Sequence, residues 1–266
     1  MQAGMKLALA ASLLALALPA AAAASTPQAG IVRPRTEQGM SPLELGYQLY
    51  AGNCSSCHGT AGLGVQPSAS AENTGGISAA GPPLRGKGAL AADFYLRTGY
   101  MPLAHPGQQP MRSRVLFSPN ELDALIAYVA SLGTGPKVPA PKPERGSLAA
   151  GLTLFTEHCA GCHQVAARGG YLTGAVAPPL TAASPTQIAE AVRVGPYLMP
   201  RFSPRAISDH ELDSIVTYVE YAKRPQNPGG WSIGRLGPVP EGLVAWFIAG
   251  AALVGCCLAI GARARR

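Results

Sequence analysis

Apolar residues recur every three or four positions in four segments of the chain, a spacing that predicts amphipathic α-helices. Two of these segments run into a pair of cysteines. The other two begin at a Ser-x-x-Glu capping sequence, which starts at Ser118 or at Ser208. Strand signals are nearly absent, so the pattern predicts a mainly α protein. The side chains expected to face the core are Leu45, Leu49, Tyr50, Leu122, Leu125, Ile126, Val129, Leu152, Phe155, Leu212, Ile215, Val216 and Val219.

The segments occur twice in the same order, which indicates a tandem duplication. "LGYQLYAGNCSSCH" matches "AGLTLFTEHCAGCH", and "FSPNELDALIAYV" matches "ISDHELDSIVTYV". Between the copies, residues 133–146 form a proline-rich run that is typical of a semi-rigid linker. We therefore expect two domains, at residues 41–132 and 147–224, and a second linker at 225–242.

The two ends of the chain carry membrane-targeting patterns. Lys6 precedes the apolar run "LALAASLLALALP" and an alanine-rich cleavage signal, which favours a removed signal peptide at residues 1–24 over a retained helix. Residues 243–261 contain no charge and are long enough to span a bilayer. The arginines at 262–266 place that tail in the cytoplasm by the positive-inside bias. We therefore expect a single-pass protein of the plasma membrane with both domains on its extracytoplasmic side.

The net charge of +7 comes mostly from the ends, because four of the 21 basic residues lie in the signal and the tail. Residues 41–135 contain five basic and five acidic side chains, and residues 146–225 contain six of each. There is no basic stripe with interleaved aromatic residues, which excludes nucleic acid as a partner.

Each domain contains the sequence C-x-x-C-H, with the histidine directly after the second cysteine. Taken alone, this motif fits half of a zinc site, a redox dithiol, or a c-type haem held by two thioethers with the histidine on its iron. Two copies favour haem, because zinc sites usually take a distant histidine and dithiols need none. The other cysteines, Cys256 and Cys257, are small apolar residues of the expected anchor. The motif residues are Cys54, Cys57 and His58, and Cys159, Cys162 and His163. They predict two covalently bound haem c groups.

Methionine is the usual second axial ligand of an electron-transfer haem c. Met199 is the only methionine after the second motif, so it is the expected partner of His163, unless His210 takes that place or the position is open. The first iron has two candidates, Met101 and Met111. The repeat favours Met101, which aligns with Met199 and also precedes a proline. The histidines expected on the surface or in loops are His105, His158 and His210.

This arrangement resembles the class I cytochrome c fold over residues 43–132 and again over 148–223. In that family the first and last helices cross closely through a small residue and an aromatic ring. The resemblance implies that these positions are Gly46 with Tyr50 and Gly151 with Phe155. The glycine- and proline-rich loops are too poor in apolar residues to make a core alone, and a large apolar cofactor would complete it.

A proline-containing loop extends the resemblance. "GPPLRG" is similar to the family's G-P-x-L-x-G loop, in which the proline carbonyl accepts a hydrogen bond from the axial histidine. The resemblance implies this role for Pro82 and Pro178. The second copy departs from the family pattern, because Ala177 stands in place of the first glycine and the last glycine is missing.

The whole mature chain, and most clearly the tail "NPGGWSIGRLGPVPEGLVAWFIAGAALVG", resembles the dihaem cytochrome c subunit of actinobacterial cytochrome bcc complexes. This resemblance implies electron transfer from a Rieske iron-sulfur centre to a haem-copper oxidase, with the Rieske and cytochrome b subunits as partners in one complex. The chain would then be an enzyme only as a subunit of a quinol–cytochrome c reductase, because two six-coordinate haems leave no substrate site.

Two alternatives stay open at this point. One is an anchored dihaem carrier for another dehydrogenase or oxidase. The other is a dihaem peroxidase, which needs one haem that can lose its sixth ligand. The insertion at residues 60–80 is either a docking element or a mobile loop.

Overall fold

The computed structural model describes residues 30–66, 80–103, 107–224 and 238–264. The chain divides after Val138 into two compact units, Met1–Val138 and Pro139–Arg266. This boundary lies inside the expected linker at 133–146. The expected signal peptide, His105 and most of the second expected linker lie outside the described residues.

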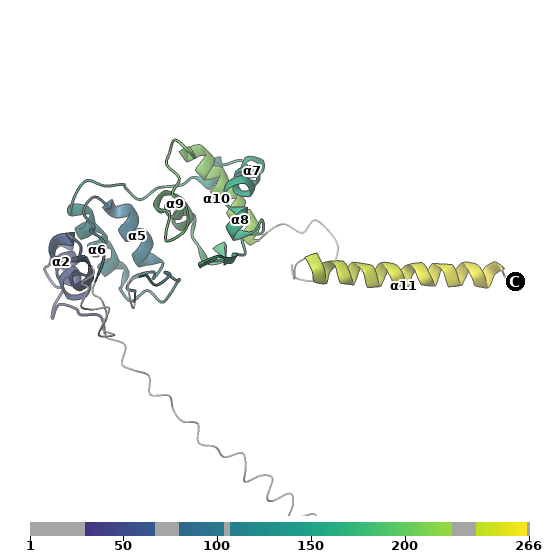
Figure 1. The fold of residues 1–266 in the computed structure, drawn as a ribbon, viewed down its shortest axis with the longest axis horizontal. Helices are drawn as coiled ribbons and strands as arrows, with labels where there is room; N and C mark the ends of the chain where they lie inside the picture. Colours follow the sequence, from purple (N-terminus) through teal and green to yellow (C-terminus); the bar gives the residue numbers. More distant parts are fainter. Residues whose placement is uncertain (1–29, 67–79, 104–106, 225–237, 265–266) are drawn as a thin grey trace, which may run out of the picture. The chain divides into compact units, whose positions relative to one another are not determined.

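Helices dominate both units (Figure 1). The first unit contains α2 (Pro42–Asn53), α3 (Ser55–His58), η2 (Thr60–Gly62), α5 (Gly88–Arg97) and α6 (Pro119–Ser131). The second contains η3 (Pro143–Arg145), α7 (Leu148–His158), α8 (Ala160–His163), β1 (Gly170–Leu172), β2 (Ala175–Ala177), η4 (Leu180–Ala182), α9 (Pro185–Val194) and α10 (Asp209–Lys223). The order of the helices in the first unit therefore recurs in the second, as the sequence repeat predicts.

The first and last helices of each unit cross at a glycine. A Cβ on Gly46 in α2 would lie 2.0 Å from the carbonyl oxygen of Ala124 in α6. A Cβ on Gly151 in α7 would lie 2.0 Å from the carbonyl oxygen of Ser214 in α10. Because only hydrogen fits at this distance, the two glycines allow the backbones to touch. This is the crossing that the resemblance implies.

An aromatic pair lies beside each crossing. The ring centroids of Tyr50 and Tyr128 are 5.1 Å apart, and those of Phe155 and Tyr218 are 5.2 Å apart, both at an interplanar angle of 49°. Such tilted pairs stabilise a core beyond the area that they bury. The same geometry in both units supports the duplication.

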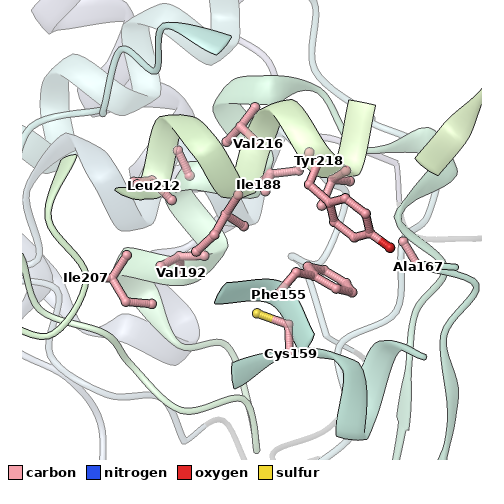
Figure 2. Packing of buried hydrophobic residues seen from close by; sticks show 12 residues of the cluster. Phe155, Cys159, Ala167, Ile188, Val192, Ile207, Leu212, Val216 and Tyr218 are labelled. Atoms are coloured by element: carbon pink, nitrogen blue, oxygen red, sulfur yellow. The ribbon is translucent and has the colours of Figure 1, made fainter. Parts of the chain in front are cut away.

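The expected core residues are buried, with one exception. Leu152 is 44% exposed, so its expected place in the core is wrong. The inward face of α7 is set by Gly151 and Phe155, and Leu152 lies one residue, about 100°, around the helix from Gly151. Tyr47, which is its counterpart in the first unit, is 53% exposed for the same reason. Figure 2 shows the buried cluster of the second unit, with the hydroxyl end of Tyr218 pointing toward Ala167.

The helix starts follow the capping prediction. The Ser118 and Ser208 hydroxyls each accept a hydrogen bond from the backbone N–H of the third helical residue, Glu121 or Glu211, and both glutamates bond back to the serine N–H. A third capping box, Ser184 with Gln187, begins α9 and was not among the expected ones. Capping of this kind contributes about 1 kcal/mol to each helix.

A short antiparallel hairpin departs from the expected near-absence of strands. Strands β1 and β2 pair Gly170 with Ala177 and Leu172 with Ala175, leaving a two-residue turn that contains Gly174 at a φ of 81°. Two-residue hairpin turns need a positive φ, which glycine adopts without strain. In the described part of the first unit, an isolated bridge joins Val65, inside the expected insertion at 60–80, to Gly81 directly after it. Residues 67–79 of that insertion lie outside the described residues.

Both ends of the 133–146 segment are attached to a unit. The backbone N–H of Leu90 donates to the carbonyl of Pro136 at 3.1 Å in the first unit. In the second unit, the Thr217 hydroxyl donates to the carbonyl of Pro143 at 2.6 Å, and the Lys142 N–H donates to Asp213 at 2.7 Å. The expected spacer is therefore shorter than its proline-rich sequence indicates.

Residues before the expected domain start also pack on the first unit. Arg33 pairs with Glu121 at 2.6 Å, and Val32 exchanges two hydrogen bonds of 2.8 Å with the Asn53 side chain. Contacts within the first unit therefore include residues 32 and 33, ahead of the expected domain start at residue 41.

The C-terminal helix α11 (Pro238–Ala264) has the properties of a membrane span. Its segment Glu241–Ala264 contains an 18-residue window with a mean hydropathy of 2.4, and none of that window is buried within the structure. The expected span at 243–261 lies within it. A helix of this length and apolar surface is a candidate membrane anchor.

Candidate haem sites

Each C-x-x-C-H motif follows directly on the first long helix of its unit. Cys54 is the C-terminal cap of α2, and Cys159 is the C-terminal cap of α7. A new helical turn then begins, in which the N–H of His58 donates to the carbonyl of Cys54 at 2.9 Å, and that of His163 to Cys159 at 2.9 Å. One turn brings residues three and four apart to the same side. Both cysteines and the histidine can therefore face one planar group.

A proline carbonyl orients each motif histidine. The Nδ1 atom of His58 lies 2.8 Å from the carbonyl oxygen of Pro82, and that of His163 lies 3.1 Å from Pro178. A carbonyl can only accept, so Nδ1 carries the proton and Nε2 keeps its lone pair. This is the tautomer that binds a metal through Nε2. The geometry supports the roles of Pro82 and Pro178, which remain predictions as parts of a haem site.

The second proline loop reaches this position by a different path. In the first unit, a Cβ on Gly81 would lie 2.6 Å from the carbonyl oxygen of Cys57, so the loop needs glycine there. Ala177 takes that place in the second unit and belongs to β2. The close approach is made instead by Gly170, whose Cβ would lie 3.2 Å from the carbonyl of Cys162. The hairpin thus compensates for the missing glycine.

The surroundings of the first cysteine in each motif favour its neutral thiol over the thiolate. Burial, and secondly the Cys57 thiol, raises the pKa of Cys54 to about 11. Burial, and secondly the Cys162 thiol, raises the pKa of Cys159 to about 11. Zinc and dithiol chemistry need thiolates, whereas a thioether to haem is uncharged. Neutral cysteine side chains are therefore compatible with thioether attachment to haem.

The surroundings agree with this reading. Burial lowers the pKa of His163 and outweighs the Pro178 carbonyl, which raises it, so the ring is kept neutral as a metal ligand requires. Within the part of the chain that the structure describes, no three His, Cys, Asp or Glu side chains converge on a site for a metal ion.

The candidate methionines occupy loops after α5 and α9. Met101 and Met199 are half-buried, and Met199 packs against the core cluster of the second unit. Met111 is 53% exposed. Half-burial suits a side chain that reaches inward from a loop, so these positions support Met101 over Met111. Ligation by either methionine remains a prediction. His158 and His210 are exposed, as expected.

Tyrosine hydroxyls form a further link that the sequence did not reveal. In the first unit, the Tyr50 hydroxyl donates to the carbonyl of Gly59 at 2.8 Å, directly after the motif. In the second unit, Phe155 has no hydroxyl, and Tyr218 of α10 donates instead to the carbonyl of Val165 at 2.7 Å. The two units stabilise the same segment from different helices, which a comparison of aligned positions misses.

Two helical units that each place a C-x-x-C-H turn after the first helix, with its histidine oriented by a proline carbonyl, define a c-type cytochrome. The family models agree. Residues 43–133 match the family Cytochrome c, and residues 146–219 match the family Cytochrome C oxidase, cbb3-type, subunit III. Domains of this class carry covalently bound haem c and transfer electrons.

Similar proteins with known names identify the family within the c-type cytochromes more closely. The chain is 36% identical over 253 residues to the cytochrome bc1 complex cytochrome c subunit of Mycobacterium bovis, a match that covers 92% of this chain and 85% of the relative. The same subunit of Mycobacterium leprae is 36% identical over 255 residues, covering 92% and 83%. That of Corynebacterium diphtheriae is 33% identical over 258 residues, covering 90% and 87%. The chain belongs to the family of cytochrome c subunits of the cytochrome bc1 complex, which confirms the family expected from the resemblance of the whole mature chain.

Proposed function

We propose that this protein holds two haem c groups and passes electrons from the Rieske centre of its complex to a haem-copper oxidase. The observation that carries the proposal is that both units build the same site. Each has a cysteine pair on one helical turn, a histidine with its Nδ1 bound to a proline carbonyl, and a half-buried methionine in an M-P loop.

The side chains in each site have separate roles. Cys54, Cys57, Cys159 and Cys162 would hold the two haems as thioethers, and His58 and His163 would bind the irons through Nε2. Met101 and Met199 would each supply the second protein ligand of one iron. The bound group supplies the redox chemistry. A methionine ligand favours the reduced state and raises the potential. With two protein ligands for each iron, the site would leave no place for a bound substrate, which suits outer-sphere electron transfer.

The anchor and the complex define the partners that we propose. The relatives are named as subunits of the bc1 complex, which supports partnership with its Rieske and cytochrome b subunits. Helix α11 would cross the plasma membrane with its arginine-bearing end in the cytoplasm. Both haem units would then lie on the extracytoplasmic side, after removal of residues 1–24.

Co-purification tests this assignment. An affinity tag on the C-terminus of this chain should recover cytochrome b, the Rieske subunit and oxidase subunits from membranes. Recovery of a different dehydrogenase or oxidase without cytochrome b would overturn the proposal. Intact mass should show two haems per chain, and a double cysteine-to-alanine variant of either motif should lose one of them.

Ligand binding separates the proposal from the peroxidase alternative. A peroxidase would expose one iron and bind cyanide rapidly at that haem. We expect low-spin Met/His spectra at both haems and slow cyanide binding at both. Rapid binding at one haem of the intact protein would contradict the electron-carrier proposal.

A further inference from the structure

A buried arginine lies directly before the loop that carries Met199. Arg193 is on the last turn of α9 and is only 8% exposed. Its Nη1 donates to two backbone carbonyls, those of Phe202 at 3.2 Å and Ile207 at 2.8 Å. Its Nη2 donates to Asp209 at 2.7 Å. A single guanidinium therefore joins the end of α9 to two points of the following loop and to the start of α10.

These contacts close the base of a short arch, which we define as residues 195–201. The backbone N–H of Phe202 donates to the carbonyl of Val192 at 2.9 Å. At the neck of the arch, a Cβ on Gly195 would lie 2.7 Å from the backbone nitrogen of Arg201, and Gly195 has a φ of 65°. Met199 lies within the arch, so its position depends on how firmly the base is held.

The far anchor of the loop belongs to the core. Ile207 is 1% exposed, and Figure 2 shows it at the same end of the buried cluster as Val192. Arg193 binds the carbonyl of this residue, so the arginine connects the arch to a fixed part of the unit. Arginine suits this task because its planar group directs several N–H donors at once and keeps its charge. Asp209 is 87% exposed, and water screens its attraction. The two carbonyl bonds therefore do most of the positioning.

The first unit holds its methionine loop with a different set of contacts. Arg97 ends α5 and pairs with carboxylates of two helices, Asp93 and Asp123, each at 2.5 Å. The base of the loop is joined there by Ser113, whose N–H donates to the carbonyl of Thr98 at 3.3 Å and whose hydroxyl donates to the carbonyl of Gly99. Among the contacts described, Arg97 therefore pairs with carboxylates, whereas Arg193 donates to two backbone carbonyls of the segment that follows its helix.

We propose that Arg193 is a positioning residue that keeps Met199 on the iron of the second haem. This inference rests on the proposed function, because it takes Met199 as the axial ligand. Without the arginine, the carbonyls of Phe202 and Ile207 lose a charged donor. The arch then opens more often, and the iron exchanges methionine for an added ligand more readily.

The test uses the full-length, detergent-solubilised protein with both haems attached. Imidazole is titrated into the oxidised protein, and loss of the methionine-to-iron charge-transfer band is followed together with the midpoint potential of each haem. For Arg193→Ala we expect the apparent imidazole affinity of one haem to rise by about tenfold or more, as loss of a charged hydrogen bond typically allows. The potential of that haem should fall, and the other haem should be unchanged. Arg193→Lys keeps the charge but loses the planar fork, and should give a smaller change at the same haem.

Three controls separate the possible outcomes. Met199→Ala should abolish the band of the second haem. If it does not, the proposed ligand is wrong, whatever Arg193 does. Asp209→Asn should resemble the unchanged protein, and Arg97→Lys should leave the second haem unchanged. The positioning role of Arg193 is refuted if Met199→Ala abolishes the band but Arg193→Ala binds imidazole with the affinity of the unchanged protein. If Arg193→Ala fails to retain its haem, Arg193→Lys decides, and an unaltered affinity there overturns the inference.

Discussion

The crossing of α7 and α10 allows a quantitative prediction. Changing Gly151 to alanine puts a Cβ 2.0 Å from the carbonyl oxygen of Ser214 and 2.9 Å from the Cβ of Tyr218. Neither atom can rotate away, because one is backbone and the other is the stem of a packed ring. Contacts below 3.0 Å require a shift, so the helices must separate by at least about 1 Å.

The cost follows from packing. Forcing packed elements apart typically costs about 1 to 3 kcal/mol. The upper part of this range applies here, because the ring pair of Phe155 and Tyr218 beside the crossing is also pulled apart. Alanine in place of glycine returns about 0.5 to 1 kcal/mol through its higher helix propensity. We expect a net loss of about 2 kcal/mol in the free energy of unfolding, which lowers the Tm of a unit of this size by about 8 to 16 °C.

Thermal unfolding of the full-length protein in detergent, followed by circular dichroism and haem absorbance, measures this change. The matched control is Gly161→Ala in the same unit. Nothing lies within 4 Å of a Cβ at Gly161, and the first unit has Ser56 at the equivalent position. The control should change the Tm little or raise it slightly. A Gly151→Ala protein as stable as its control would refute the close crossing.

Three further predictions concern the first unit. Tyr50→Phe removes the buried donor to Gly59 and should lower the free energy of unfolding in urea by about 1 kcal/mol. Burial raises the pKa of Glu121, but the Arg33 guanidinium and the helix cap lower it by more, so the folded pKa is below the usual value of 4.5. The stability contributed by this carboxylate is present above that value and is lost as pH falls through the lower folded pKa. Glu121→Gln should therefore flatten the decline of stability in acid. Met101→Ala should lower the potential of one haem and remove its charge-transfer band, whereas Met111→Ala should leave both unchanged.

For each of these three predictions, one experimental result would contradict it. Tyr171→Phe is the control for Tyr50, since Tyr171 is 92% exposed, and equal losses for the two would show that the hydroxyl bond is unimportant. An acid profile of Glu121→Gln that parallels the unchanged protein would contradict the Glu121 assignment. If Met111→Ala lost the charge-transfer band of one haem and Met101→Ala kept it, Met111 and not Met101 would be the ligand of the first iron.

Local sequence patterns were sufficient for the parts of this protein that depend on near neighbours. Helix caps at Ser118 and Ser208, the cysteine and histidine spacing and the apolar span of α11 are set by residues within one or two turns of one another. Internal repetition added longer-range information, because it aligned Met101 with Met199, whereas the crossing glycines came from the resemblance to the class I cytochrome c fold. These features could be predicted because short-range geometry is nearly independent of the rest of the fold.

The tertiary structure decided the features that depend on contacts between residues far apart in the sequence. Leu152 fits a helical apolar stripe, yet it is exposed, because Gly151 and not Leu152 meets α10. The hairpin replaces a missing glycine at Ala177 with one at Gly170, from a segment that no aligned position identifies. Arg193 is one of several arginines in the sequence, and only the folded loop brings two carbonyls to its guanidinium. The sequence by itself determined where the main helices form and which residues are candidate haem ligands. The fold alone determined which faces are buried and what holds each ligand loop, because those depend on backbone contacts between residues far apart in the chain.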